Sequence, residues 1–380
     1  MRVLLWIVLI VWIAAFFRTI LNLLAVKRLP ADAPDDGPRV SVIIPARNEE
    51  QSIERTVRAF LAQSYRHLEL IVVDDRSSDA TGSILDRLAA ADKRLRVIHG
   101  EEPPGGWLGK PWALHQGSRR ATGEVLLFVD ADIVYEPDAV RRAVAAFRAA
   151  GVPMIGLLPH FEMKGFWENV LIPQLAVFFF TVIPAWLANR TRTVWLGVGG
   201  GTGNMIDRAF YESIGGHEAL RDAVVDDVAL ARLVRRNGRG TIVFRADDCV
   251  SVRIYRGFRE TVNGFTKNAF AVAERSFLLA TAFVSGVIVV HVLPYAVAVT
   301  GEPISLATVA IITLARLLLF RSLRYPLLYA LFAHPLMVSV WAYIVLRSMW
   351  FTGVRGELRW RGRSYDAAQT HFGGDIRARL

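Results

Sequence analysis

Two aspartates flank a single alanine in the first half of this 380-residue sequence. Asp130 and Asp132 directly follow the apolar run 126–129, so two carboxylates stand close together without bulk between them. Carboxylate oxygens of this kind suit Mg²⁺ or Mn²⁺, whose remaining ligands can be water and a diphosphate. Because an Asp-x-Asp pattern is common by chance, its position after a strand-like run is what favours a metal site.

A second acidic pair, Asp74 and Asp75, also ends an apolar run, at residues 68–73. Asp79 lies just before a helical pattern, where aspartate is a favoured N-cap, and is interpreted as structural. Capping does not account for two adjacent acids at the end of a strand. Asp75 is therefore expected to accept hydrogen bonds from a base or a ribose.

A third acidic pair, Asp226 and Asp227, opens a helical pattern. One interpretation is a cap, with an acid in the first turn favoured by the helix dipole. The other is a carboxylate placed near an acceptor hydroxyl, as base-assisted displacement at an anomeric carbon requires.

Two glycine-containing segments are candidates for contact with an anion. Lys110 lies in the aromatic, glycine-rich stretch 106–112, where its ammonium could meet a phosphate, although a solvated lysine is the alternative. The run 197–203 permits close approach of the backbone to a ligand, or is simply a flexible loop. No Lys-Ser/Thr follows it, which excludes a Walker-type phosphate loop.

The elements that must position these residues alternate along the chain between short apolar runs and amphipathic helical patterns. Strands are predicted at residues 40–44, 68–73, 95–98, 125–129 and 154–158, and helices at 52–63, 82–91, 112–121 and 137–150. Uninterrupted apolar strands alternating with helices indicate an α/β sheet covered on both faces. Ligands bind such sheets beyond the carboxyl ends of the strands, so residues 45–49, 74–79 and 130–132 are expected along one edge.

Long apolar runs near both ends of the chain predict a membrane protein. Residues 1–26 are long enough for a spanning helix and show no signal-peptide cleavage site, so we expect an uncleaved anchor. Three further candidate spans are residues 276–300, 303–320 and 327–351, for which buried helices of a soluble core are the disfavoured alternative. The aromatic stretch 166–187, interrupted by prolines, suits a helix in the membrane interface or beside an acceptor groove, or a buried core helix.

The net charge of +10 is concentrated beside these apolar runs rather than in a nucleic-acid motif. The basic residues concerned are Lys27, Arg28, Arg321, Arg324, Arg355, Arg359, Arg361 and Arg363. This distribution is typical of juxtamembrane residues that face anionic headgroups and the cytoplasm. Cys249 is the only cysteine, which excludes an intrachain disulfide and a thiolate metal cage and fits a reducing compartment.

The expected division of the chain is an anchor at 1–26, a linker at 27–39, an α/β domain at 40–275, a transmembrane region of up to three spans at 276–351, and a basic tail at 352–380. Lys27 and Arg28 predict an inner-membrane, multi-pass protein whose α/β domain is cytoplasmic. Three full downstream spans would then leave the basic tail outside. Either one stretch does not cross, or the positive-inside tendency fails here.

In this order and spacing, the clusters resemble the family 2 glycosyltransferases, which are inverting enzymes with the GT-A fold, a Rossmann-like mixed sheet with helices on both faces. The resemblance covers residues 40–275 and rests on the stretches 42–49, 72–79, 109–113, 128–132 and 225–230. The stretches 106–112, 253–260, 264–268 and 360–363 look like the membrane-anchored branch associated with hopanoid and carotenoid glycosylation.

The resemblance implies a role for each matching residue. Asp227 would be the catalytic base, Asp132 the ligand of a divalent cation, and Asp130 a neighbour of both metal and donor. The substrate-binding set would comprise Pro45, Arg47, Glu49, Asp75, Lys110, Asp130, Asp226, Arg253 and Arg256. Arg256 is followed by Gly257 and Phe258 where the family often has tryptophan, so this part of the acceptor-side motif departs from the pattern.

The expected activity is transfer of a sugar from a nucleotide-diphosphate sugar, with UDP favoured, to a lipid acceptor of the polyisoprenoid, hopanoid or carotenoid kind at the cytoplasmic face of the membrane. A processive polysaccharide synthase is the alternative enzyme, although three or four spans are few for a polymer channel. A membrane protein that only binds nucleotide sugars, or acts as a scaffold, is the alternative of another class.

Overall fold

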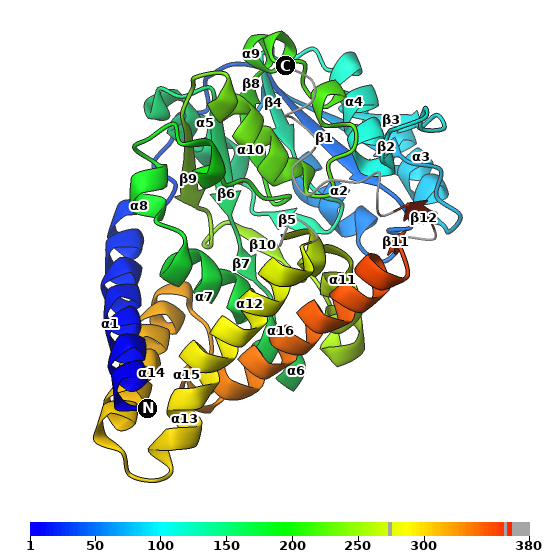
Figure 1. Cartoon of the computed structure of the whole chain (residues 1–380). Coiled ribbons are helices and arrows are strands. Elements are labelled where there is room, and N and C mark those ends of the chain that lie inside the picture. Colours follow the sequence, from blue (N-terminus) through cyan, green and yellow to red (C-terminus); the bar gives the residue numbers. More distant parts are fainter. Residues whose placement is uncertain (273–275, 361–362, 367–380) are drawn as a thin grey trace. The chain divides into compact units, whose positions relative to one another are not determined.

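The computed structural model describes residues 1–272, 276–360 and 363–366 (Figure 1), and its described residues form two compact units. The sheet unit comprises Lys27–Glu162 and Leu187–Arg253. The helical unit comprises Met1–Val26, Met163–Trp186 and the described residues from Ile254 onward. The stretch 163–186 therefore groups with the apolar helices at the two ends of the chain.

A seven-stranded sheet forms the centre of the sheet unit, with strand order β3-β2-β1-β4-β8-β6-β9. The strands are β1 (Val40–Ala46), β2 (Leu68–Asp74), β3 (Leu95–His99), β4 (Val125–Phe128), β6 (Met154–Leu158), β8 (Asn204–Asp207) and β9 (Thr241–Arg245). All five predicted strands are confirmed. Apart from the edge strand β3, they are buried on both faces, which is why they read as continuous apolar runs instead of alternating ones.

The sheet is mixed because β8 is antiparallel to both of its neighbours, β4 and β6. The other pairings of this sheet are parallel, including those of β1 with β2 and β4. A smaller sheet has the order β5-β10-β7, with strands β5 (Ile133–Tyr135), β10 (Val250–Val252) and β7 (His160–Phe161). This topology places the carboxyl ends of β2, β1 and β4 next to one another.

Helices follow the strands of the sheet unit. They are α2 (Ile53–Leu61), α3 (Thr81–Ala91), α4 (Gly109–Arg120), α5 (Ala139–Ala150), α9 (Arg208–Ser213) and α10 (Asp226–Arg236). Of these, α2, α3, α4, α5 and α10 match the predicted helical patterns, whereas α9 was not predicted. Ile43 of β1 packs in one core cluster with Leu114 of α4 and Leu230 of α10. Helix α4 begins three residues earlier than expected, so Lys110 lies in its first turn and not in a loop.

Within its described residues, the helical unit contains four helices that are long and apolar enough to cross a membrane, judged by length and composition. These candidate spans are Arg2–Ala25 (α1), Phe277–Ala298, Pro303–Leu323 (α14) and His334–Val354. The third predicted downstream span differs from its expected bounds: α15 (Leu327–Phe332) ends before α16 (His334–Ser348), which has a proline in its first turn. Proline lacks the amide that would continue a helix, so the chain breaks there.

The stretch 166–187 forms three short helices, α6 (Phe166–Leu171), α7 (Pro173–Val182) and α8 (Ala185–Ala188), and no full span. Within the helical unit, Asn22 of α1 donates hydrogen bonds of 2.9 and 2.7 Å to the carbonyls of Phe180 and Ile183. Its side-chain oxygen accepts from the amide of Trp186 at 3.0 Å. This asparagine satisfies the backbone where α7 ends.

The remaining helical segments of this unit are α11 (Gly257–Val272), α12 (Phe277–Val287), a π-helical turn (Ile288–Val292), α13 (Leu293–Ala298) and a second π-helical turn (Met349–Val354). Of the expected basic tail, the strands β11 (Glu357–Trp360) and β12 (Arg363–Asp366) form an antiparallel pair. Residues 361–362 and 367–380 lie outside the described residues.

Candidate functional site

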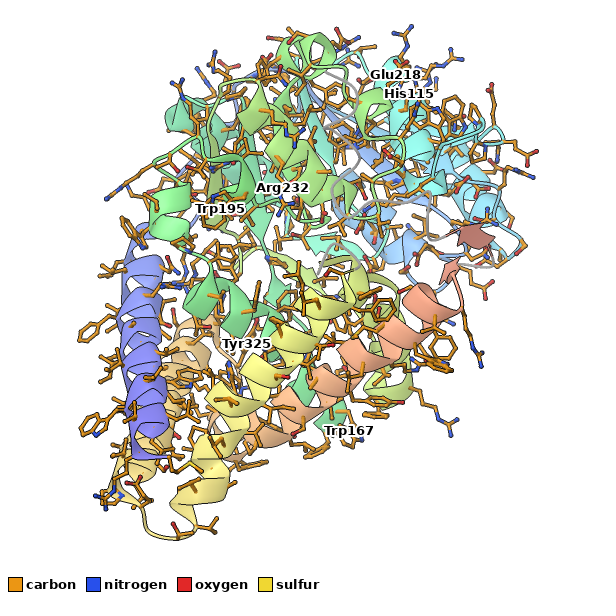
Figure 2. The ribbon with its side chains drawn as sticks, in the orientation of Figure 1. His115, Trp167, Trp195, Glu218, Arg232 and Tyr325 are labelled. Carbon is orange, nitrogen blue, oxygen red and sulfur yellow. The ribbon has the colours of Figure 1, made fainter. Side chains whose placement is uncertain are left out.

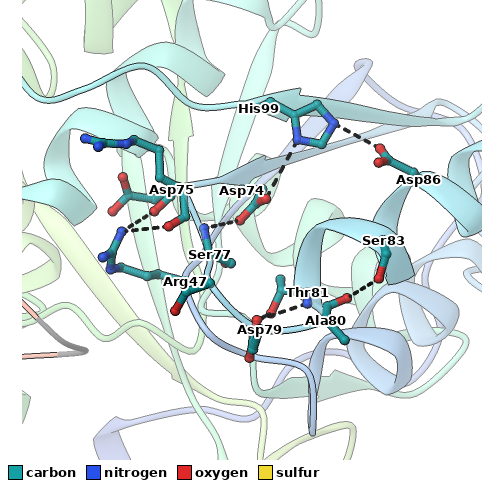
Figure 3. A network of polar contacts seen from close by, with 12 residues as sticks. Arg47, Asp74, Asp75, Ser77, Asp79, Ala80, Thr81, Ser83, Asp86 and His99 are labelled. Carbon is teal, nitrogen blue, oxygen red and sulfur yellow. Dashed lines mark hydrogen bonds and ion pairs between the residues drawn. The ribbon is translucent and has the colours of Figure 1, made fainter.

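The ends of β1 and β2 are joined by a network of polar contacts (Figure 3). The amide of Asp75 donates to the carbonyl of Ala46 at 2.7 Å, and the Arg47 guanidinium donates to the carbonyls of Asp75 and Arg76. The two clusters that we expect to lie together, 45–49 and 74–79, are therefore in contact. Asn48 and Arg76 both have a positive φ, so each strand ends in a sharp turn.

The individual acids of this network differ in their surroundings. Asp75 is only 2% exposed. Asp74 accepts from the amide of Ser77 and lies 3.7 Å from a ring nitrogen of His99, which also contacts Asp86 (Figure 3). Asp79 accepts from the amide of Thr81, the first residue of α3, at 3.0 Å, but the N-cap position itself is held by Ala80, so the predicted cap is displaced by one residue.

Glu49 lies in the turn that precedes helix α2 and accepts hydrogen bonds from it. Its carbonyl accepts from the amides of Ser52 and Ile53, and its carboxylate accepts from the Ser52 hydroxyl at 2.9 Å. Pro45 is the half-buried penultimate residue of β1, beside Val73 of β2. Both residues thus lie at the expected edge of the sheet.

The turn that carries Asp130 and Asp132 is fixed from two sides. The Asp130 amide donates to the carbonyl of Gly201 at 2.7 Å, and the Thr56 hydroxyl donates to the carbonyl of Ala131 at 2.9 Å. Asp132 then leads into β5 and is half-buried. Because the backbone is fixed at Asp130 and at Ala131, the direction in which the Asp130 side chain leaves the backbone is also fixed.

Lys110 connects two of the predicted acidic clusters. Its Nζ lies 2.8 Å from Oδ1 of Asp130 and 3.0 Å from Oδ1 of Asp226. Burial by itself lowers the pKa of Lys110, but the neighbouring carboxylates of Asp130, Asp226 and Asp227 raise it well above the ordinary value. The lysine is therefore a permanent cation between the turn after β4 and the start of α10.

Asp226 and Asp227 occupy the first turn of α10, yet they differ in environment. Asp226 is buried against Lys110, whereas the carboxylate of Asp227 accepts from the amide of Val228 at 2.7 Å. Burial and the like charge of Asp226 raise the pKa of Asp227 to about 7, against the opposing effect of Lys110. A carboxyl group that titrates near neutrality is suited to accept a proton and release it again.

These acids and Lys110 line one pocket of the sheet unit. The full lining is Lys110, Leu114, Phe128, Val129, Asp130, Gly200, Gly201, Asn204, His217, Asp226, Asp227 and Leu230. Asp132, although close in sequence to Asp130, is not part of this lining. The lining combines charged and polar side chains with apolar ones, which is the usual composition of a small-molecule site.

The glycine run predicted to allow close backbone approach forms part of this pocket. A Cβ on Gly201 would overlap the Asp130 carboxylate, and a Cβ on Gly199 would overlap the backbone carbonyl of Asp227. Asn204, 2% exposed, accepts from the amide of Gly200 and donates to that same carbonyl. Gly199 and Gly201 therefore pack closely against Asp227 and Asp130, as the interpretation of close backbone approach requires.

Sequence reasoning missed His217, which lines the pocket and is 1% exposed. Its Nδ1 lies 2.8 Å from the Tyr211 hydroxyl, which also accepts from the His217 amide and donates to Ser118. Burial and the charge of Lys110 lower the pKa of His217 to about 3, so the ring is uncharged at neutral pH. The two glycines with positive φ before it, Gly215 and Gly216, are the signal that this turn is specialised.

Of the nine predicted substrate residues, three line the pocket: Lys110, Asp130 and Asp226. The other six do not: Pro45, Arg47, Glu49 and Asp75, which belong to the ends of β1 and β2, and the two arginines Arg253 and Arg256. Arg253 directly follows β10 in the sheet unit. Arg256 belongs to the helical unit, where its amide donates to Glu260 in the first turn of α11. Nothing in the placement of these arginines assigns them to an acceptor.

The donor atoms available for a divalent cation are the carboxylates of Asp130 and Asp132. Among the described residues, no cluster of three or more histidine, cysteine or acidic side chains has the arrangement of a metal cage. Two hard oxygen donors in one short turn nevertheless fit Mg²⁺ or Mn²⁺, because these ions commonly take their remaining ligands from phosphates and water. The residues thus fit a metal that binds together with its ligand.

The fold is of the GT-A-like α/β class. A mannosyltransferase from Pyrobaculum calidifontis, solved in complex with GDP-Man and Mn²⁺, superposes with a TM-score of 0.55 at 22% sequence identity. The superposition covers 91% of this chain and 99% of that protein. It therefore extends over the apolar helices as well as the sheet.

The family follows from the sequence. Residues 41–215 match the profile of glycosyl transferase family 2, and this part of the chain is a family 2 glycosyltransferase domain. A 4,4'-diaponeurosporenoate glycosyltransferase of Staphylococcus aureus is 26% identical over 234 residues, which are 60% of each chain. An uncharacterized glycosyltransferase of Nostoc sp. is 32% identical over 127 residues, 33% of this chain and 37% of that one. The chain thus aligns with about a third to three fifths of the length of these curated relatives.

Proposed function

We propose that this protein transfers a sugar from a nucleotide-diphosphate sugar to a lipid acceptor at the cytoplasmic face of the membrane, with inversion at the anomeric carbon. The observation that carries the proposal is the pocket in which Lys110 joins Asp130 and Asp226 beside the titratable Asp227. The family 2 domain gives the reaction class, and the four apolar helices among the described residues support a membrane location.

In the proposed reaction, the acceptor hydroxyl oxygen forms a bond to the anomeric carbon while the bond from that carbon to the donor phosphate oxygen breaks. The electron pair of the broken bond remains on the nucleotide diphosphate, and Asp227 takes the acceptor proton. A residue with a pKa near 7 is ionised in a useful fraction of molecules and basic enough to assist the attack. Attack from the face opposite the leaving group inverts the configuration.

Charge on the leaving group is the main electrostatic problem of such a transfer. Lys110 supplies a fixed cation in a partly buried pocket, where its charge is screened less than in water. Asp130 and Asp132 would hold Mg²⁺ or Mn²⁺, which when bound supplies Lewis-acid stabilisation of the diphosphate. The network around Arg47 and Asp75 at the ends of β1 and β2 would receive the nucleoside.

The relatives support a lipid acceptor and a metal. The S. aureus relative is named for a carotenoid acid, and the Pyrobaculum mannosyltransferase was solved with GDP-Man and Mn²⁺. Since the resemblance favours UDP while the fold relative holds GDP, both nucleotides belong in a test.

The direct test supplies the full-length protein in membranes with radiolabelled UDP- and GDP-sugars and a membrane lipid extract, after chelation and again after addition of Mn²⁺. Label in the organic phase that depends on Mn²⁺ and is absent with Asp227→Asn supports the proposal. Long labelled polymer would instead identify a processive synthase. Donor binding without any labelled product would identify a nucleotide-sugar-binding protein.

A further inference from the structure

A short segment of the sheet unit displays a tryptophan and two arginines to solvent. Trp195, in the turn Val194–Leu196, is 65% exposed although its ring is large and apolar (Figure 2). Arg190 and Arg192 are exposed a few residues before it. No acidic residue occurs between Glu168 and Asp207 in the sequence, so the charges of this stretch are all positive.

The backbone of this segment is fixed by hydrogen bonds from a buried arginine. The guanidinium of Arg235, on α10, donates to the carbonyls of Ala188, Thr191 and Thr193 at 2.7, 3.1 and 3.1 Å. Arg235 is itself only 3% exposed. These three contacts fix the backbone of residues 188–193. The exposed side chains of this segment therefore have defined positions.

The far side of the same segment is attached to the sheet. Asn189 exchanges two hydrogen bonds with the backbone of Val243 in β9, at 3.0 and 3.2 Å. Further along, Gly197 lies so close to Arg232 that a Cβ would come within 2.9 Å of the Arg232 side chain. The segment is therefore clamped between β9 and α10.

Strand β9 also forms hydrogen bonds with the residues that directly follow the first apolar helix, α1. The amide of Arg245 donates to the carbonyl of Lys27 at 2.8 Å, and the amide of Leu29 donates to the carbonyl of Arg245 at 3.0 Å. Lys27 follows the last residue of α1, Ala25, by two positions. The exposed segment bonds to Val243, and the residues that follow α1 bond to Arg245. Both are thus attached to β9, at positions two residues apart.

We propose that Arg190, Arg192 and Trp195 form a contact surface for the headgroups of anionic phospholipids, here called the Trp195 surface. Arginine binds phosphate through paired N–H donors, and tryptophan favours the boundary between headgroups and acyl chains. Polybasic residues near a membrane are attracted to its anionic lipids over about one Debye length. The inference concerns membrane contact and does not depend on the proposed transfer reaction.

The segment that carries the Trp195 surface is followed in the sequence by residues that line the pocket. Leu196, the residue after Trp195, leads through Gly199 to Gly201, whose carbonyl holds the amide of Asp130. Binding of a headgroup to the segment would therefore further stabilise the backbone that positions a carboxylate of the pocket.

The test places a fluorophore on Thr193→Cys in the full-length protein, in lipid discs that carry a nitroxide quencher near the headgroups. Thr193 is exposed, and the natural Cys249 is buried. Discs with about 30 mol % anionic lipid are compared with discs of zwitterionic lipid only. We expect clear quenching with anionic lipid, and a shift of the contact equilibrium by at least about fivefold relative to zwitterionic lipid.

Matched variants assign the effect. Arg190→Ala combined with Arg192→Ala should lower the quenching to the zwitterionic level, whereas Arg119→Ala combined with Arg120→Ala, an exposed pair at the end of α4, should leave it unchanged. Equal quenching in both lipids, no quenching in either, or the same loss in the control pair would overturn the proposal. None of these readings involves sugar transfer, so an inactive enzyme leaves the inference intact and testable.

Discussion

Lys110 and Asp226 form an ion pair, with 3.0 Å between Nζ and Oδ1, that links the first turn of α4 to the first turn of α10. The same ammonium lies 2.8 Å from Asp130 after β4. Lys110 therefore contacts two acids that are far apart in the sequence, Asp130 and Asp226, and both lie near Asp227. The proposed chemistry depends on this arrangement more than on any single motif.

Replacement of Lys110 by methionine should weaken the site in two ways. The variant keeps the length of the side chain but leaves the carboxylates of Asp130 and Asp226 to repel each other. We expect at least about tenfold weaker binding of nucleotide diphosphate, and a loss of about 1–3 kcal/mol in the free energy of unfolding. Titration calorimetry and thermal unfolding measure both. Lys93→Met, at an exposed position, is the control and should change neither quantity.

Gly201 should not tolerate a methyl group. Gly201→Ala places a Cβ against the carboxylate of Asp130, which must then move. We expect metal-dependent donor binding to fall by about tenfold or more, since a misplacement of about 1 Å is enough to disrupt a positioned site. Gly200→Ala is the matched control, because its nearest neighbour would be the Thr202 hydroxyl at 3.4 Å. Equal effects of the two substitutions on binding would show that Gly201 has no special fit.

The Tyr211 hydroxyl should contribute more to stability than an ordinary buried tyrosine hydroxyl. It contacts the amide and ring of His217 and the hydroxyl of Ser118, whereas the Tyr65 hydroxyl donates to the carbonyl of Pro38. Tyr211→Phe is expected to cost about 1–3 kcal/mol and Tyr65→Phe about 1 kcal/mol. Denaturant titration compares them. A smaller loss for Tyr211→Phe than for Tyr65→Phe would be inconsistent with the network described around His217.

Much of the sheet was predictable because its strands carry their own signal. The run at β1 is apolar on both faces, and β2, β4 and β6 follow the same rule, so burial determines both composition and structure. The short strand β8 escaped prediction since its residues, Asn204–Asp207, combine two polar and two apolar side chains. Its antiparallel insertion depends on tertiary pairing, which no local pattern encodes.

Individual residues of the candidate site could be predicted from the sequence, but the contacts between them could not. Asp130 and Asp227 stand out locally, because each lies at the boundary of a strand or helix. The contact of Lys110 with two acids that are far apart in the sequence, at 2.8 and 3.0 Å, follows only from the packing of α4 against α10. His217 had no local signal beyond its glycine turn, since a single histidine is more often a core residue than a site residue.

The rate of transfer should depend on pH through Asp227. The proposed base acts only when ionised, and its pKa is raised to about 7 by burial and by Asp226. We therefore expect kcat/KM to rise about tenfold per pH unit below pH 7 and to level off above about pH 8. Initial rates at saturating metal between about pH 5 and pH 9 measure this. A flat profile over the range would argue against a titrating base.

The same shift predicts an effect on stability, with the sign opposite to that of a salt-bridged acid. Because the pKa of Asp227 is higher in the folded protein than its unfolded value of about 4, its contribution to stability is complete below about pH 4 and is lost as the pH rises through about 7. Asp227→Asn cannot ionise, so it should unfold at a higher temperature than the natural protein at pH 8 and show little gain at pH 4. Thermal unfolding at the two pH values measures this, and an equal gain at both would be inconsistent with the raised pKa.

Turnover and donor binding measured together in Asp227→Asn decide whether Asp227 is the base of a sugar transfer. Asparagine keeps the size of the side chain and the contact with the Val228 amide, but it cannot accept the proton. We predict a loss of turnover of about 10²–10⁴-fold with donor affinity within about threefold of the natural protein. Turnover at the natural rate would show that Asp227 is not the base.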